Sequence, residues 1–248
     1  MEGMSTVHGV SPIKNEVNKQ PERIARMFDQ IAWRYDRLNH LLSAGIDRRW
    51  RRRAIKELQL TGRERVLDVC TGTADLAIAA ASGGAESVVG IDFAGAMLAI
   101  GREKVQRAAL GDRLHLARAD AMRIPLRDAS VDAATIAFGI RNVADPVVGC
   151  AECHRVLRPG GRLAILEFGT PTLPIFRQVY GWYFRVVLPR LGRFISRHGD
   201  AYDYLPASVS EFPSGAAFVK VLQQAGFTDV RSVPLTLGTV YLYVARKS

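Results

Sequence analysis

Apolar residues near the start of the chain recur at the three- to four-residue spacing of an amphipathic helix. They are Ile24, Met27, Phe28, Ile31, Tyr35 and Leu38. Gly45 interrupts this pattern, and Asp47 is of a residue type that commonly caps the start of a helix. The pattern therefore predicts N-terminal helices within residues 21–60, the second one capped by Asp47 and ending at Leu58.

From residue 66 onward, short apolar runs alternate with helical stretches. We predict strands at residues 66–69, 87–91, 114–116, 132–137 and 162–168, and helices at residues 74–81, 94–109 and 146–157. This alternation is typical of an α/β fold, in which helices cover both faces of a parallel sheet. An aromatic- and proline-rich insertion then occupies residues 169–212. A helix at residues 213–225 and strands at residues 228–235 and 239–245 follow it.

Composition sets limits on this picture. The chain has 248 residues, of which 48% are hydrophobic, and it can bury a core without disulfides or metals. Three cysteines fit a reducing, cytoplasmic location, and there is no run of about 18 apolar residues that would span a membrane. We predict a single domain over residues 21–248. The polar residues 1–20 have no signal-peptide pattern and are expected to form a disordered leader.

The turn after the first predicted strand has features of a nucleoside site. In a doubly wound sheet, ligands bind beyond the carboxyl ends of the strands. Gly72 allows a ligand to approach the backbone closely there, and Asp92 ends the second strand, where an acid accepts hydrogen bonds from a ribose. Only one glycine of the G-x-G-x-x-G pattern is present. A cofactor with a base and a ribose but no phosphate therefore fits better than a dinucleotide.

A second polar segment, FGIRNV at residues 138–143, follows the predicted strand at residues 132–137. It places the guanidinium of Arg141 beside the carboxamide of Asn142, directly after a buried strand. A surface loop can hold these residues by chance, but a binding site would need them. In this fold class the segment would lie at the same sheet edge as Gly72 and Asp92.

The order of these features resembles a known superfamily. Asp68, Gly72, Asp92, Asp120 and the Leu157-Arg158-Pro159-Gly160-Gly161 turn follow one another along the chain. This order resembles the class I S-adenosylmethionine-dependent methyltransferases. The resemblance implies a Rossmann-like sheet of seven strands, the last one antiparallel, and S-adenosylmethionine as the cofactor.

Several longer segments resemble one family more closely. They lie at residues 27–29, 32–36, 41–45, 66–76, 138–143, 166–168 and 200–205. From about residue 25 to the C-terminus, they resemble the UbiE/MenG-type C-methyltransferases of menaquinone and ubiquinone biosynthesis. The resemblance implies methylation of the quinol ring of demethylmenaquinol, of a ubiquinol precursor, or of both, and the sequence does not choose between these branches.

The resemblance also implies which residues contact the cofactor. They are Asp68, Gly72, Thr73, Asp92, Phe93, Asp120, Ala121 and Ala137. Two positions depart from the family pattern, because many relatives have glycine in place of Ala74 and serine in place of Ala137. A side-chain hydroxyl contact to the cofactor is therefore absent at position 137.

The implied reaction requires particular chemistry from the site. An aromatic carbon is a weak nucleophile, so the neighbouring ring hydroxyl must lose a proton and the resulting oxyanion must be stabilised. Arg141 is the candidate for stabilising the charge and is a poor base, and Asn142 is the candidate for orienting cofactor or quinol. As proton acceptor, Asp200 and His198 rank ahead of Tyr202. These three residues fit a polar lid without proton chemistry equally well.

The quinol carries a long isoprenoid tail, for which the insertion at residues 169–212 is a candidate cap. Net charge is +10, and the predicted second helix contains Arg48, Arg49, Arg51, Arg52 and Arg53. These arginines predict a peripheral contact with an anionic membrane surface. A solvated basic helix explains them equally well.

Other readings carry less weight. Residues 150–154 match the C-x-x-C-H haem pattern, but they fall within a predicted helix, and we expect no metal site. A methyltransferase for RNA or another small molecule, and a non-catalytic binding protein, are the alternative functions. No RNA-binding module accompanies the arginines, so no nucleic-acid partner is expected. The sequence leaves open whether the chain forms a homodimer.

Overall fold

The computed structural model describes residues 20–43, 45–171, 178 and 200–248. The predicted leader at residues 1–20 lies outside these residues except for Gln20. Most of the predicted insertion, residues 172–177 and 179–199, also lies outside them.

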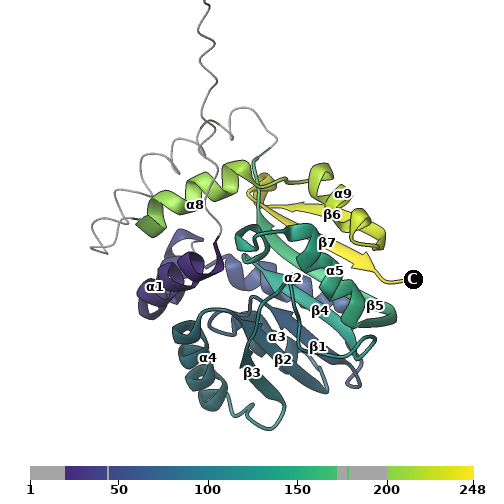
Figure 1. The fold of residues 1–248 in the computed structure, drawn as a ribbon. Coiled ribbons are helices and arrows are strands. Elements are labelled where there is room, and N and C mark those ends of the chain that lie inside the picture. Colours follow the sequence, from purple (N-terminus) through teal and green to yellow (C-terminus); the bar gives the residue numbers. More distant parts are fainter. Residues whose placement is uncertain (1–19, 44, 172–177, 179–199) are drawn as a thin grey trace, which may run out of the picture.

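Seven strands form a single sheet in the order β3-β2-β1-β4-β5-β7-β6 (Figure 1). The strands are β1 (Arg65–Val69), β2 (Ser87–Asp92), β3 (Leu114–Arg118), β4 (Val131–Ala137), β5 (Leu157–Phe168), β6 (Thr228–Leu235) and β7 (Val240–Arg246). Pairing is parallel from β3 through to β5, whereas β7 pairs antiparallel with both β5 and β6. The predicted seven-stranded sheet with an antiparallel last strand is confirmed.

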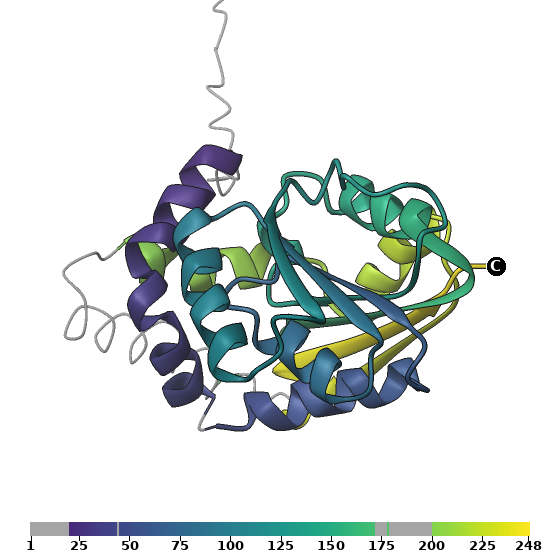
Figure 2. The same cartoon turned by 90° about the horizontal axis from the view of Figure 1, so that it is seen from below.

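Helices cover both faces of this sheet (Figure 2). One face carries α2 (Asp47–Leu58), α3 (Asp75–Ser82) and α4 (Gly95–Arg107), and the other carries α5 (Pro146–Val156) and α9 (Ala216–Gln224). Successive side chains of a strand point to opposite faces. In β5, Leu163 and Ile165 therefore join the core with α5 and α9, whereas Ala164 and Leu166 join the core with α2 and α3.

Two further helices lie near the carboxyl ends of the parallel strands (Figure 1). They are α1 (Pro21–Leu42) and α8 (Asp200–Glu211). Ala32 of α1 packs with Ala94 and Met97 at the start of α4. Both helices thus stand at the edge of the sheet where this fold class binds its ligands. Among the residues that the structure describes, none of the helices combines the length and the apolar character that a bilayer crossing needs.

Local signals explain several element boundaries. The Asp145 carboxylate accepts hydrogen bonds from the backbone of Val147 and Val148, and Pro146 is the first residue of α5, so this helix starts with a side-chain cap. The prediction that Asp47 caps α2 was wrong. Ile46 takes the N-cap position, and Asp47 lies buried in the first turn, where Arg51 binds its carboxylate.

Candidate active site

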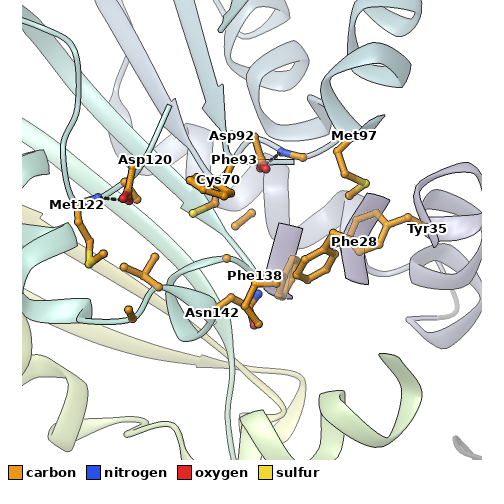
Figure 3. A pocket seen from close by; sticks show the side chains of 17 residues that line it. Phe28, Tyr35, Cys70, Asp92, Phe93, Met97, Asp120, Met122, Phe138 and Asn142 are labelled. Atoms are coloured by element: carbon orange, nitrogen blue, oxygen red, sulfur yellow. Dashed lines mark hydrogen bonds between the residues drawn. The ribbon is translucent and has the colours of Figure 1, made fainter. Parts of the chain in front are cut away.

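A cavity opens at the carboxyl ends of the central strands, beside α1 (Figure 3). It holds about 690 Å³ of empty space, including the part that is open to solvent. Residues that line it are Ile24, Phe28, Tyr35, Cys70, Gly72, Asp92, Phe93, Met97, Asp120, Ala121, Met122, Ala137, Phe138, Gly139, Asn142, Val143 and Ala144. Segments that are far apart in sequence therefore build one site.

Asp92, at the end of β2, forms the first polar edge of the cavity. One carboxylate oxygen accepts a hydrogen bond from the Gly72 N–H at 2.7 Å, and the other accepts from the Ala94 N–H at 2.8 Å. Burial raises the pKa of Asp92 above its ordinary value. Each carboxylate oxygen has two lone pairs, so the side chain retains acceptor capacity for the hydroxyls of a ribose.

Gly72 makes this edge accessible. Its φ of +55° lies in the left-handed region, which glycine adopts without strain. A Cβ at this position would stand 3.4 Å from the Met97 methyl carbon, within the wall of the cavity. The glycine therefore allows the turn after β1 and leaves space for a ligand beside Asp92.

The next part of the wall is flat and mostly apolar. Phe93 lies beside Asp92 and has the Arg118 guanidinium 5.6 Å from its ring centroid. Asp120 accepts a hydrogen bond from the Met122 N–H at 2.8 Å, which fixes its carboxylate at the cavity (Figure 3). An aromatic ring and a carboxylate acceptor suit a purine base with an exocyclic amino group.

The segment at residues 138–143 forms the opposite side. Phe138 has a φ of +57°, and the chain then turns through Gly139 into a short 3₁₀-helix, η1 (Ile140–Asn142). A Cβ on Gly139 would stand only 2.2 Å from the Cys70 Cβ, so no side chain fits there while Cys70 keeps its position. The turns after β1 and β4 thus meet in direct contact on the cavity floor.

Asn142 presents its side chain to the cavity, and Tyr204 of α8 holds it. The Tyr204 hydroxyl donates to the Asn142 Oδ1 at 3.0 Å. Burial raises the pKa of Tyr204, so its hydroxyl keeps the proton that it donates. With Oδ1 engaged in this way, the Asn142 Nδ2 group is the part of the amide that can donate to a bound molecule.

Arg141 lies behind the cavity wall. Its side chain is 5% exposed, and Nη1 donates to the Glu167 Oε1 at 2.7 Å and to the Phe138 carbonyl at 2.6 Å. The guanidinium also stands 5.3 Å from the Phe168 ring centroid. Its Nε is buried and has no hydrogen-bond partner among the described residues. The arginine therefore stands at the back of the site as the positive member of a buried ion pair with Glu167.

Two predicted cofactor residues line a smaller adjoining cavity instead of the large one. Asp68 is buried, and it accepts hydrogen bonds from the hydroxyls of Thr71 and Thr135, each at 2.6 Å. Burial raises the pKa of Asp68 to about 6. The Thr73 hydroxyl donates to Asp36 of α1 at 2.5 Å. Both side chains therefore bind protein groups in the structure, and their contact with the cofactor stays a prediction.

An ionic network fixes α1 and α2 near the cavity. Lys104 of α4 pairs with Asp36 at 2.9 Å and also with Asp75. Arg51 pairs with Asp47 and, at 3.5 Å, with Asp75. Because Arg51 is buried in this network, it is not part of the exposed basic surface that the sequence predicted for the second helix.

The predicted site residues thus fall into three groups. Those that line the large cavity are Gly72, Asp92, Phe93, Asp120, Ala121, Ala137 and Asn142. Those beside it are Asp68, Thr73 and Arg141. His198 lies outside the described residues. Asp200 and Tyr202 belong to α8, but their side chains are not described.

Sequence reasoning missed several residues of the wall. Phe28 and Tyr35 of α1 line the cavity, and Tyr204 holds Asn142. The segments at residues 27–36 and 200–205 were singled out by resemblance, and that was the signal that pointed to them. Cys150 and Cys153 are buried in the core, and within the described residues no cluster of His, Cys, Asp and Glu is placed to hold a metal.

Known proteins with similar sequences were found over almost the whole chain. A model of the ubiE/COQ5 methyltransferase family matches residues 15–247. The chain is 52% identical to the ubiquinone/menaquinone biosynthesis C-methyltransferase UbiE of Geobacter sp. (strain M21), covering 93% of this chain and 99% of that relative. It is 41% identical to a demethylmenaquinone methyltransferase of Bacteroides fragilis, covering 96% of this chain and 97% of the relative.

Solved structures support the fold. A SAM-dependent methyltransferase from Thermotoga maritima matches with a TM-score of 0.63 at 17% identity, covering 91% of this chain and 100% of that one. One from Aquifex aeolicus matches with a TM-score of 0.59 at 21% identity, covering 80% and 89%. These matches confirm the predicted class I methyltransferase fold.

Proposed function

The chain belongs to the ubiE/COQ5 methyltransferase family, and we propose that it methylates a ring carbon of demethylmenaquinol, of a ubiquinol precursor, or of both. The enzyme is an S-adenosylmethionine-dependent methyltransferase. One observation carries the proposal for its site: a single cavity joins the carboxylate edge at Asp92 to the carboxamide of Asn142. Cofactor and quinol would meet between these two edges.

The residues of the first edge fit the cofactor. Asp92 has acceptor capacity for ribose hydroxyls, and Phe93 and Asp120 suit the base. The cavity has no row of glycines to bind a pyrophosphate, which agrees with a nucleoside that carries no phosphate. When bound, S-adenosylmethionine supplies a methyl group on a positively charged sulfur.

The second edge would act on the quinol. Its ring hydroxyl must lose a proton before the adjacent carbon becomes an effective nucleophile. We assign the stabilisation of the resulting oxyanion to the Arg141 charge and to the Asn142 Nδ2 group. Phe138 and the apolar residues of α1 would exclude water. Asp200 and His198 stay our first candidates for the proton acceptor, ahead of Tyr202. Of these three, Asp200 and Tyr202 belong to α8, which joins the site through Tyr204.

The isoprenoid tail of such a quinol keeps the substrate in the bilayer. We therefore propose that the enzyme works in the cytoplasm and meets its substrate at the inner membrane surface, without spanning it. The insertion at residues 169–212 stays our candidate for the cap over the quinol. We expect no nucleic acid as partner, and a homodimer stays an open prediction.

Quinone analysis of cells tests this function. Cells that lack the gene should accumulate demethylated quinones by mass spectrometry, and the chain supplied in trans should restore the methylated form. The Asp92→Ala variant should fail to restore it. Which quinone recovers decides between the menaquinone and ubiquinone branches. Unchanged quinones in the deletion strain, or recovery with Asp92→Ala at the level of the unmodified chain, would contradict the proposal.

A further inference from the structure

Helix α2 carries an exposed basic surface on the side turned away from the core. The side chains of Arg48, Arg49, Arg52, Arg53 and Lys56 are exposed, and we call them the α2 basic surface. Trp50, Arg51, Ala54, Ile55 and Leu58 fill the buried side of the same helix. The helix has two acids. Asp47 is buried against Arg51, and Glu57 pairs with Arg53 and with Arg231 of β6. Most of the positive charge on this surface is therefore not neutralised.

An exposed leucine lies next to this surface. Leu237 is 55% exposed and sits in η3 (Thr236–Gly238) between β6 and β7. The Trp50 Nε1 of α2 donates to the Thr236 hydroxyl at 3.0 Å, which attaches this turn to the helix. Leu237 has a φ of +57°, an uncommon conformation for a leucine. The turn thus holds an apolar side chain in solvent and is attached to the helix that carries the α2 basic surface.

The η3 turn and the N-terminal end of α2 lie at the edge of the sheet that carries the active site, and α2 runs from there across the sheet face to Leu58, whose carbonyl accepts from Arg162 near the start of the paired part of β5. Phe168, the last residue of β5, pairs with Val240 at the start of β7, so η3 stands at the carboxyl end of the parallel strands. Trp50 also lies 6.1 Å from Phe138, measured between ring centroids, and Phe138 lines the cavity. A single aromatic residue therefore separates the η3 turn from the wall of the site.

We propose that the α2 basic surface and Leu237 form the docking site of the enzyme on an anionic lipid bilayer. Arginines near such a surface each contribute about 1 kcal/mol of attraction, and a leucine gains by entering the boundary of the acyl chains. Docking here brings the carboxyl edge of the sheet, and with it the cavity, next to the bilayer. The inference rests on the proposed function, because only a substrate with a lipid tail requires this encounter.

The first experiment measures vesicle binding of the full chain. We expect it to sediment with vesicles that contain phosphatidylglycerol and not with pure phosphatidylcholine, and to dissociate as salt rises. The Arg49→Glu/Arg52→Glu variant should bind anionic vesicles at least 100-fold more weakly, since it replaces attraction with repulsion. Leu237→Gln should weaken binding about fivefold, at low and at high salt alike.

A matched control makes the same change of charge elsewhere. Arg113 and Arg127 are exposed and lie in the loops before β3 and before β4, so Arg113→Glu/Arg127→Glu should leave vesicle binding within about threefold of the unmodified chain. Circular dichroism confirms that each variant is folded. Equal losses in the control and in Arg49→Glu/Arg52→Glu would overturn the assignment. So would tight, salt-sensitive binding of a single-stranded RNA oligomer that the Arg49/Arg52 variant abolishes while vesicles do not bind.

Enzyme assays separate this inference from the proposed function. With a quinol analogue that lacks the tail, the docking variants should react at the unmodified rate. With a long-tailed quinol in anionic vesicles, their rate should fall at least tenfold. If the unmodified chain and the variants methylate neither quinol, the proposed function is wrong. The vesicle-binding measurement still tests the docking site in that case. Equal rates on long-tailed quinol for all variants would overturn the docking site alone.

Discussion

The two sides of the active-site cavity are built by different kinds of contact. On the cofactor side, backbone N–H groups hold the carboxylates: Gly72, in the turn after β1, and Ala94 donate to Asp92, and Met122 donates to Asp120. On the quinol side, side chains from distant elements hold the polar groups. Glu167 of β5 binds Arg141, and Tyr204 of α8 binds Asn142.

We propose that the cofactor side of the cavity governs cofactor affinity and that the quinol side governs turnover. A side that is held by its own backbone is rigid before any ligand arrives, which suits a cofactor that binds in one geometry. A side that depends on β5 and α8 has its charges fixed by other parts of the fold. We therefore expect cofactor-side substitutions to change affinity and quinol-side substitutions to change turnover.

The largest effect on affinity is expected for Asp92→Ala. The change removes the acceptor that we propose for the ribose and the partner of two N–H groups, so the cofactor dissociation constant should rise roughly 100-fold or more. Calorimetry of S-adenosylmethionine binding measures this. Asp112→Ala, which removes an exposed acid, is the control and should bind normally. Normal affinity in Asp92→Ala with lost turnover would break the division between the two sides.

The matching substitution on the quinol side is Arg141→Ala. Turnover should fall about 100-fold, while cofactor affinity stays within about threefold, because the charge acts only as the oxyanion forms. Single-turnover rates and calorimetry separate the two quantities. Unchanged turnover would contradict the role that we assign to Arg141.

Stability must be controlled in that experiment. Removing Arg141 leaves Glu167, which is fully buried, as an unpaired charge, and this costs about 3–5 kcal/mol of unfolding free energy. The double variant Arg141→Ala/Glu167→Gln removes that charge as well and should unfold closer to the unmodified chain. If it recovers stability but not turnover, the loss of rate belongs to the chemistry.

A third prediction concerns Asp68, which lies beneath the cofactor side without lining the large cavity. Its folded pKa of about 6 exceeds the ordinary value of 3.8, so the folded state holds this proton more tightly than the unfolded state. The stabilisation from this group is complete below about pH 4 and is lost as the pH rises through about 6. As the pH rises from about 4 to about 6, the free energy of unfolding of Asp68→Asn should therefore increase by about 3 kcal/mol relative to that of the unmodified chain.

Urea unfolding of both proteins across this pH range measures the difference. Cofactor affinity of Asp68→Asn, measured at one pH, should stay within a few-fold of normal, since Asp68 binds only Thr71 and Thr135 in the described structure. If the free energies of unfolding of the two proteins change with pH in the same way, the pKa of Asp68 is not raised.

The smallest effect is expected for Tyr204→Phe. It removes one hydrogen bond to Asn142, so turnover should fall three- to tenfold, with normal cofactor affinity. Asn142→Asp keeps the acceptor for Tyr204 but loses the Nδ2 donor, so its turnover should fall further. If Tyr204→Phe weakens cofactor binding instead, Asn142 contacts the cofactor and belongs to the cofactor side of the cavity.

The same division explains what sequence could predict. Apolar runs locate six of the seven strands to within two residues at each end, and β5 begins five residues before its predicted start. The signal is strongest for β1, β4 and β7, because a strand that is buried on both faces must be apolar. Gly72 and Asp92 could be placed because both follow directly from where β1 and β2 end. Arg141 was predicted to stabilise the oxyanion, and that role stays a prediction. The structure places it behind the cavity wall, and its pairing with Glu167 depends on strand register across β4 and β5. The sequence around Arg141 does not specify that register, so the ion pair with Glu167 could not be predicted from it.

Thr73 and Asp47 show the same limit. Each is of a residue type that suits a local role, the one as a cofactor contact and the other as a helix cap. The Asp47 carboxylate binds Arg51 instead of capping α2, and the Thr73 hydroxyl donates to Asp36 of α1, while its contact with the cofactor stays a prediction. Competition between a local and a tertiary partner is decided by packing, which only the folded chain reveals.

The close approach of Gly139 to Cys70 has a consequence for changing the enzyme by mutagenesis. With 2.2 Å between the Cys70 Cβ and a Cβ built on Gly139, no single substitution at position 139 fits beside an unchanged neighbour. Cys70→Gly opens that space. A library that varies positions 70 and 139 together can therefore reshape the floor of the cavity, whereas libraries that vary position 139 alone should return mostly inactive clones.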